Sequence, residues 1–149
     1  MDVAALITWL ITAGGGFILL GTWIAKGGHR TDTRPSSHLT PGQVFGHFLL
    51  AAGGLVLWIV YVASDSRGVG WVALADIVVV ALLGFSMFFR WLPQVRARQP
   101  VAAAVGGRTS GDGAGEATPE QRFPLPVVVL HGLLGATTLL LVLIAATRS

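Results

Sequence analysis

The sequence predicts an all-α integral membrane protein, a single domain of four transmembrane helices that form a bundle. Hydrophobic residues make up 53% of the 149 residues and charged residues 11%, whereas a soluble domain carries roughly 25% charged residues. Mean hydropathy is +0.71. The apolar residues also gather into four runs of about 20 residues, the length that crosses a bilayer core as a helix. We therefore expect the lipid bilayer to surround this chain.

The four apolar runs define the predicted spans, which are residues 3–25, 43–63, 69–91 and 125–147. The first run has no separate basic segment and no Ala-x-Ala cleavage site, so we expect a retained span and not a removed signal peptide. Before the second run, Thr40 and Pro41 are typical of a helix start, with Gln43 completing a capping box. The Thr-Pro-Glu-Gln string at 118–121 repeats this chemistry before a short surface turn. Residues 97–121 are rich in Gly, Ala, Ser and Thr and are predicted to form a flexible cytoplasmic loop.

Charge asymmetry predicts the orientation of the chain. The first and third loops with their flanks hold eight basic residues against two elsewhere, namely Lys26, Arg30, Arg34, Arg90, Arg96, Arg98, Arg108 and Arg122. By the positive-inside rule these loops are cytoplasmic and both termini lie outside. The aromatic side chains near the span ends are then expected at the two membrane interfaces, with Trp23 and Trp91 inside and Trp58, Tyr61 and Trp71 outside.

Several classes of function are excluded or left without support. The chain has no cysteine, which excludes disulfides, iron–sulfur clusters and thiolate zinc sites. Its basic residues flank the spans, where they favour membrane orientation and anionic lipid over nucleic acid. No nucleophile–base–acid constellation is visible, so whether the protein is an enzyme stays open. Abundant Gly, Ala, Val and Arg beside a single Lys suggest a bacterial protein, located in the cell membrane.

Two histidines occupy matching places in the second and fourth spans. His47 opens the string His-Phe-Leu-Leu-Ala-Ala, and His131 opens His-Gly-Leu-Leu-Gly-Ala. Together with a Leu-Leu-Gly string shared by residues 19–21 and 82–84, this similarity suggests two duplicated helical hairpins related by an axis along the membrane normal. The two histidine-bearing spans then run in the same direction, and the two imidazoles lie at one depth. Histidines inside spans are uncommon and mark functional sites.

A strip of small side chains accompanies each histidine. The positions four and seven residues beyond the two histidines are Ala51, Gly54, Gly135 and Thr138, and such offsets share a helix face. A flat macrocycle between two helices requires such strips, and one imidazole from each side would ligate its iron. Gly14, Gly21 and Gly84 would allow the neighbouring helices to close around the group. The alternative is that the small residues allow close helix packing with nothing between the helices, and that each histidine donates a hydrogen bond to another helix or reaches the headgroups.

With these residues, the sequence resembles the transmembrane b-type cytochromes, whose haem lies between parallel helices and is held by one histidine from each. The resemblance covers the four-span layout and two positions, His47 and His131. It implies one haem b near the cytoplasmic side, with iron ligated by both histidines and with Ala51, Gly54, Gly135 and Thr138 lining the site. It also implies electron transfer with a quinone or another membrane redox partner.

Asp76 is the only carboxylate inside a predicted span, and an intramembrane acid is a functional candidate, here a proton relay from the outer face. Its alternative is a side chain that reaches the outer interface. Two other functions stay open for the whole protein. One is a cofactor-free accessory subunit of a larger, respiratory-type membrane complex, and the other is a small transporter or channel subunit that works as a homo-oligomer.

Overall fold

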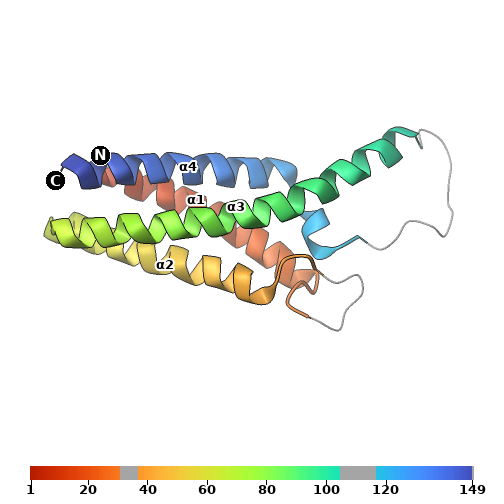
Figure 1. Cartoon of the computed structure of the whole chain (residues 1–149), viewed down its shortest axis with the longest axis horizontal. Coiled ribbons are helices and arrows are strands. Elements are labelled where there is room, and N and C mark those ends of the chain that lie inside the picture. Colours follow the sequence, from red (N-terminus) through yellow and green to blue (C-terminus); the bar gives the residue numbers. More distant parts are fainter. Residues whose placement is uncertain (31–36, 105–116, 149) are drawn as a thin grey trace.

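The computed structural model describes residues 1–30, 37–104 and 117–148 and is all-helical in these ranges. Its long helices are α1 (Asp2–Ala25), α2 (Pro41–Ser64), α3 (Arg67–Ala104) and α4 (Leu125–Arg148), and a short 3₁₀ helix, η1 (Pro119–Arg122), precedes α4. The long helices run up and down in one bundle, with both termini at the end opposite the two long connections (Figure 1). The predicted cytoplasmic residues Arg34 and Arg108 lie outside the described residues.

Three of the four helices begin and end within two residues of the predicted boundaries, whereas α3 differs. It continues to Ala104, well past the predicted end at Trp91. Arg, Gln and Ala dominate this extension, and they favour helix whether or not lipid surrounds them. Within the segment 97–121, predicted to be a loop, residues 97–104 are helical and residues 119–121 belong to η1, while its flexibility and its cytoplasmic side stay predictions. Residues 105–116 lie outside the described residues.

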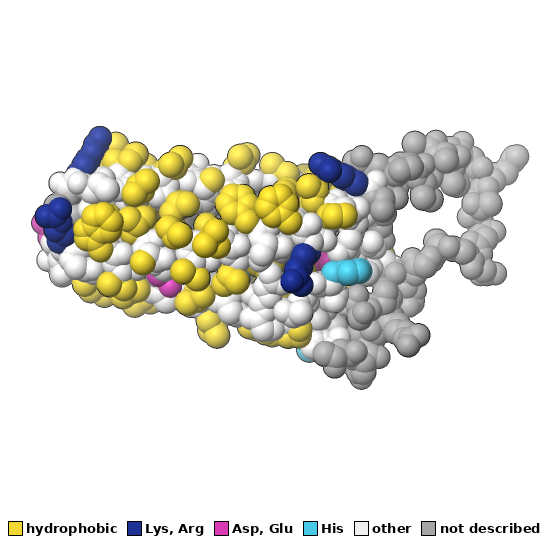
Figure 2. Space-filling model, in the orientation of Figure 1, with side chains coloured by type: hydrophobic (Ala, Val, Ile, Leu, Met, Phe, Trp, Pro, Cys, Tyr) yellow, Lys and Arg dark blue, Asp and Glu magenta, His cyan; other side chains and the backbone are white. Residues whose placement is uncertain are grey.

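The apolar residues of the bundle face outward. The four helices are each long and apolar enough to span a membrane, with mean hydropathies of 1.9 to 2.5 in their most apolar windows, yet only 11 to 22% of those windows is buried inside the protein. Hydrophobic side chains cover the middle of the visible face, and Lys and Arg lie toward its two ends (Figure 2). An exposed apolar surface of this extent is typical of a protein whose solvent is lipid.

The helices pack as two close pairs. α1 packs most extensively against α4, and α2 against α3, while the seams between these pairs are sparser. The diagonal helices α2 and α4 do not pack against each other directly. α2 and α4 therefore belong to different close pairs. A side chain of α2 that points across the bundle meets side chains of α4 in the interior of the bundle.

The hydrophobic core lies at the end of the bundle that carries the termini. Its buried residues come from all four long helices and are Ala5, Trp9, Trp58, Tyr61, Ala73, Leu74, Ile77, Val142, Ala145 and Ala146. Within it, the Trp58 indole donates to the backbone oxygen of Asp2 at 3.1 Å. The core combines the small residues Ala145 and Ala146 of α4 with large rings of α1 and α2, and small residues let helices approach closely.

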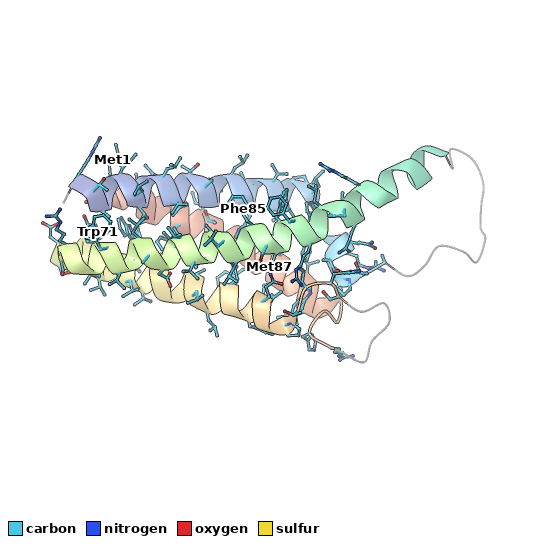
Figure 3. The ribbon with its side chains drawn as sticks, in the orientation of Figure 1. Met1, Trp71, Phe85 and Met87 are labelled. Carbon is cyan, nitrogen blue, oxygen red and sulfur yellow. The ribbon has the colours of Figure 1, made fainter. Side chains whose placement is uncertain are left out.

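The predicted aromatic belts are only partly right. Trp71 is 46% exposed and lies at the end of the bundle that carries Met1 (Figure 3). Trp58 and Tyr61 belong to the core instead, and Trp23 and Trp91 are buried at the opposite end. Indole rings bury a large apolar area while their N–H groups need one acceptor each, and the interior supplies those acceptors here. The rings therefore close the two ends of the bundle from within.

Candidate functional site

The structure brings the two span histidines together inside the bundle. His47 extends from α2 and His131 from α4, and their ring centroids lie 6.3 Å apart with an angle of 65° between the ring planes. Each histidine stands six residues into its helix, because α2 begins at Pro41 and α4 at Leu125. Equal depth on two co-directional diagonal helices thus places one imidazole opposite the other.

Each imidazole is held by a backbone carbonyl of the neighbouring helix. The Nδ1 atom of His47 lies 3.0 Å from the oxygen of Val80 on α3, and the Nδ1 atom of His131 lies 2.9 Å from the oxygen of Thr12 on α1. A carbonyl only accepts hydrogen bonds, so Nδ1 must be the protonated nitrogen of each ring. In neutral imidazole this leaves Nε2 with a free lone pair. Both rings therefore carry the tautomer that an Nε2-bound metal requires.

Glycines provide the room for both rings. A Cβ at Gly84 would lie 3.3 Å from Cε1 of His47, and a Cβ at Gly16 would lie 3.1 Å from Cε1 of His131. Gly84 follows Val80 by four residues and Gly16 follows Thr12 by four, so carbonyl and glycine share a helix face in each case. The prediction for Gly14 and Gly21 is wrong, because a Cβ at either position would meet nothing within 4 Å. On α1 it is Gly16 that leaves space for the ring of His131.

The two histidine environments correspond residue by residue. Thr12 and Val80 are 68 residues apart, as are Gly16 and Gly84, and the buried rings of Trp23 and Trp91 keep the same interval. This packing corrects the register suggested by the two Leu-Leu-Gly strings, which would pair Gly84 with Gly21. Short apolar strings match by chance, whereas the residues that contact the two histidines align the halves of the chain at an interval of 68 residues.

The small residues predicted beside the histidines contact neighbouring helices. Gly54 is buried, and a Cβ there would clash with Oδ2 of Asp76 and approach Trp9. A Cβ at Gly135 would lie 3.8 Å from the methyl group of Thr12. Thr138 is buried with its hydroxyl donating to the oxygen of Leu134, and Ala51 is half-buried. Gly54 and Gly135 thus permit close helix packing, the alternative considered for these strips.

Burial changes sharply along the bundle at the level of the histidines. In α1 no residue between Trp9 and Trp23 is buried, and the described residues of the other helices show the same gap at 41–53, 78–90 and 125–137. Core residues lie beyond one end of this stretch, and Trp23, Trp91 and Glu120 lie beyond the other. At this level the rings of His47 and His131 meet between the diagonal helices, while Phe17 and Phe48 meet between α1 and α2.

Asp76 points into the bundle and not to the outer interface. Its Oδ2 atom is buried and has no hydrogen-bond partner among the described residues, and it lies against Gly54, next to Trp9. Gly54 follows His47 by seven residues on α2, which corresponds to roughly 10 Å along the helix axis. The carboxylate is therefore near the histidines but cannot ligate a metal between them.

A polar junction closes the loop end of the bundle, and the sequence analysis missed it. The fully buried Glu120 accepts hydrogen bonds from the Ser37 hydroxyl at 2.8 Å and from the His38 backbone N–H at 2.7 Å, and it pairs with Nδ1 of His38 at 3.0 Å. The Trp23 indole donates to Ser37, and the Trp91 indole donates to the Glu120 backbone oxygen. His38 is thus tied to η1. Asp112 and Glu116 lie in the same stretch of the sequence, so no local pattern distinguishes Glu120 as a buried acid.

The electrostatics of Glu120 follow from this packing. Burial alone raises the pKa of its carboxyl group, but the hydrogen bonds from His38 and Ser37 to the charged form outweigh that effect. The net pKa of Glu120 therefore lies below its ordinary value. The junction holds an ionised carboxylate that ties together the first connection, η1 and two indole rings.

Comparison with known proteins adds no relative, because no protein-family model, no curated protein and no solved structure matches this chain. Among the described residues, no group of three or more histidine or acidic side chains could hold a metal ion alone. Any function assigned to the histidines therefore rests on their own geometry.

Proposed function

We propose that the protein binds one haem b between α2 and α4, with His47 and His131 as axial ligands, and that it transfers electrons in the membrane. The observation that carries this proposal is the separation of the imidazoles. A metal–imidazole nitrogen bond of about 2 Å places the centroids of two rings on opposite sides of one metal about 6 Å apart. The centroids of His47 and His131 are 6.3 Å apart.

The tautomer of the two rings supports the same site. With both Nδ1 atoms engaged by the carbonyls of Val80 and Thr12, the nitrogens free to ligate are the two Nε2 atoms. Hydrogen bonds of this kind orient a ligating imidazole and raise its basicity. The backbone supplies both acceptors, so the ligand orientation depends on helix packing and not on further side chains.

The burial pattern supports a macrocycle as the occupant. Between Trp9 and Trp23 the α1 axis rises roughly 20 Å, which exceeds the width of a porphyrin, and no residue in this stretch is buried. A simple divalent ion would require more ligands than two imidazoles, whereas a porphyrin brings four nitrogens of its own. The donor set of this chain therefore fits haem better than a bare metal.

When bound, the haem would supply a one-electron centre. His47 and His131 would hold the haem, and the apolar core on one side and the buried rings of Trp23 and Trp91 on the other would limit access of water to it. We propose a quinone or another membrane redox partner as the source or acceptor of electrons. We also propose a bacterial cell membrane location with the basic loops cytoplasmic and the termini outside. Two duplicated hairpins would explain why the two ligand environments correspond.

The visible spectrum of detergent-purified protein from haem-replete cells tests this function. We expect a Soret band and, after dithionite reduction, the sharper bands of a ferrous b-type haem. His47→Ala and His131→Ala should each abolish or strongly weaken these bands, while His29→Ala, which alters an exposed histidine outside the helices, should keep them. A colourless wild-type protein would contradict the proposal. If such a preparation held stoichiometric partner proteins, it would indicate the accessory-subunit alternative.

A further inference from the structure

We propose that Asp76 takes up one proton when the His47–His131 site receives an electron, so that electron entry is coupled to proton uptake from an aqueous phase. This inference rests on the proposed haem site and adds a second functional residue to it. Asp76 contributes no ligand. Its role follows from the position of its carboxylate and from the absence of a hydrogen-bond partner for Oδ2 among the described residues.

The carboxylate of Asp76 is unusual because its buried oxygen has no partner. Oδ2 makes no hydrogen bond among the described residues and faces Gly54 and the Trp9 ring. An ionised carboxylate in such surroundings carries a large desolvation cost unless positive charge compensates for it. A bound proton removes that cost, and so would the net positive charge of an oxidised haem nearby. Asp76 would therefore be ionised while the site is oxidised and would bind a proton when an added electron cancels that positive charge.

The distance between Asp76 and the histidines is suitable for such a response. The roughly 10 Å between Gly54 and His47 along α2 excludes direct ligation but permits strong electrostatic interaction. With an effective dielectric constant of about 20, one added electron at this distance changes proton affinity on the order of tenfold. At the same distance in water the effect would be about fourfold weaker in energy. The membrane location thus makes the coupling effective.

Few other titratable side chains lie in the helices around Asp76. Among the helices around Asp76, the spans of α2 and α4 carry three titratable side chains, His47, Tyr61 and His131. α1 carries none between Asp2 and Lys26. Both histidines are committed through Nδ1 to backbone carbonyls. Tyr61 lies seven residues beyond Gly54, in the core at the terminal end of the bundle. The carboxylate of Asp76 is the group whose charge can change at little structural cost.

The coupled step is balanced as follows. In the haem-loaded protein, a one-electron donor of the hydroquinone class, or dithionite in the assay, would lose one electron to the haem that His47 and His131 would hold. One proton from water binds the Asp76 carboxylate and makes it a carboxylic acid. Reoxidation removes the electron and releases the proton.

The test measures the reduction potential of the haem-loaded protein across the neutral pH range. The potential of wild type should fall with rising pH, with a limit of about 59 mV for each tenfold change in proton activity. Asp76→Asn should decrease this slope while the visible spectrum stays unchanged. Asp65→Asn is the matched control, since Asp65 terminates α2 in a left-handed conformation (φ 51°) that Asn also adopts, and it should keep the wild-type slope.

Proton uptake during reduction, measured with an indicator dye in weak buffer, tests the same step without any variant. Uptake by wild type supports the inference, and its loss in Asp76→Asn assigns it to this residue. A haem-loaded wild type without uptake, or an Asp76→Asn protein with the wild-type slope, would overturn the inference and leave the haem site standing. A wild type that binds no haem would overturn both.

Discussion

A single methyl group added at Gly16 provides a sharp test of how the imidazoles are held. In Gly16→Ala the new Cβ would lie 3.1 Å from Cε1 and 3.7 Å from Nδ1 of His131. The first distance is shorter than an ordinary van der Waals contact, so the ring must shift by a few tenths of an ångström. The bond between Nδ1 and the Thr12 oxygen, now 2.9 Å, would lengthen or bend as the ring moves.

The size of the effect follows from that hydrogen bond. A neutral intramolecular hydrogen bond contributes about 0.5–1.5 kcal/mol, which corresponds to roughly twofold to tenfold in a binding constant. We therefore expect Gly16→Ala to weaken haem binding by up to about tenfold. Because the ring also leaves its ligating orientation, the reduction potential should shift as well.

Gly21→Ala is the matched control for this experiment. Gly21 lies on the same helix, and a Cβ there would meet nothing within 4 Å. Both variants gain the same helix-propensity term of up to about 1 kcal/mol, so a difference between them reports on the histidine. Haem titration of the apoprotein, followed at the Soret band, gives both affinities. Equal affinities for Gly16→Ala and wild type, or an equal loss in Gly21→Ala, would refute the reasoning.

Three further predictions concern the rest of the bundle. Glu120→Gln should lower the free energy of unfolding by about 1–3 kcal/mol, because the amide cannot accept all the hydrogen bonds that the buried carboxylate accepts. Thermal unfolding in detergent measures this loss of stability, and an unchanged midpoint would contradict the prediction. Because the pKa of Glu120 is lowered in the folded protein, its contribution should be complete above the ordinary Glu pKa of about 4.3 and disappear as the pH falls below it, an acid sensitivity that Glu120→Gln should lack. Trp58→Phe removes the donor to the Asp2 oxygen and should cost about 1 kcal/mol without altering the haem spectrum; a lost spectrum would show that the core and the site are not independent. Gly54→Ala should destabilise the bundle much more than Gly53→Ala, because a Cβ at Gly54 meets Asp76 and Trp9 whereas one at Gly53 meets nothing within 4 Å, and equal midpoints would contradict that packing.

The sequence was most informative where one physical rule dominates. Bilayer-length apolar runs predict the four helices, and the matching strings around His47 and His131 predict equal depth on co-directional helices. The sequence could not show that the rings point at each other, because helix rotation depends on packing between distant segments. That packing is set by Gly16, Gly84 and the two carbonyl acceptors, and backbone carbonyls leave no signature in a sequence.

The misses have related causes. Trp23, Trp58 and Trp91 were expected to be exposed at the membrane interfaces by residue type, but their rings are buried and their N–H groups find acceptors at the ends of the bundle. The junction of Glu120 with Ser37 and His38 joins residues more than 80 positions apart. Polar contacts of that kind follow from the tertiary fold, whereas the capping string at 118–121 could be recognised from local sequence alone.

The most direct test of the account is the coordination state of iron in the purified protein. Haem content and the electron paramagnetic resonance spectrum of the ferric form should show one haem per chain with a low-spin signal, because two strong-field imidazoles complete its coordination. His47→Ala or His131→Ala should leave either no haem or a high-spin signal. A low-spin haem that persists in either variant would contradict the assignment of both histidines as ligands, and a wild-type protein free of haem would contradict the account as a whole.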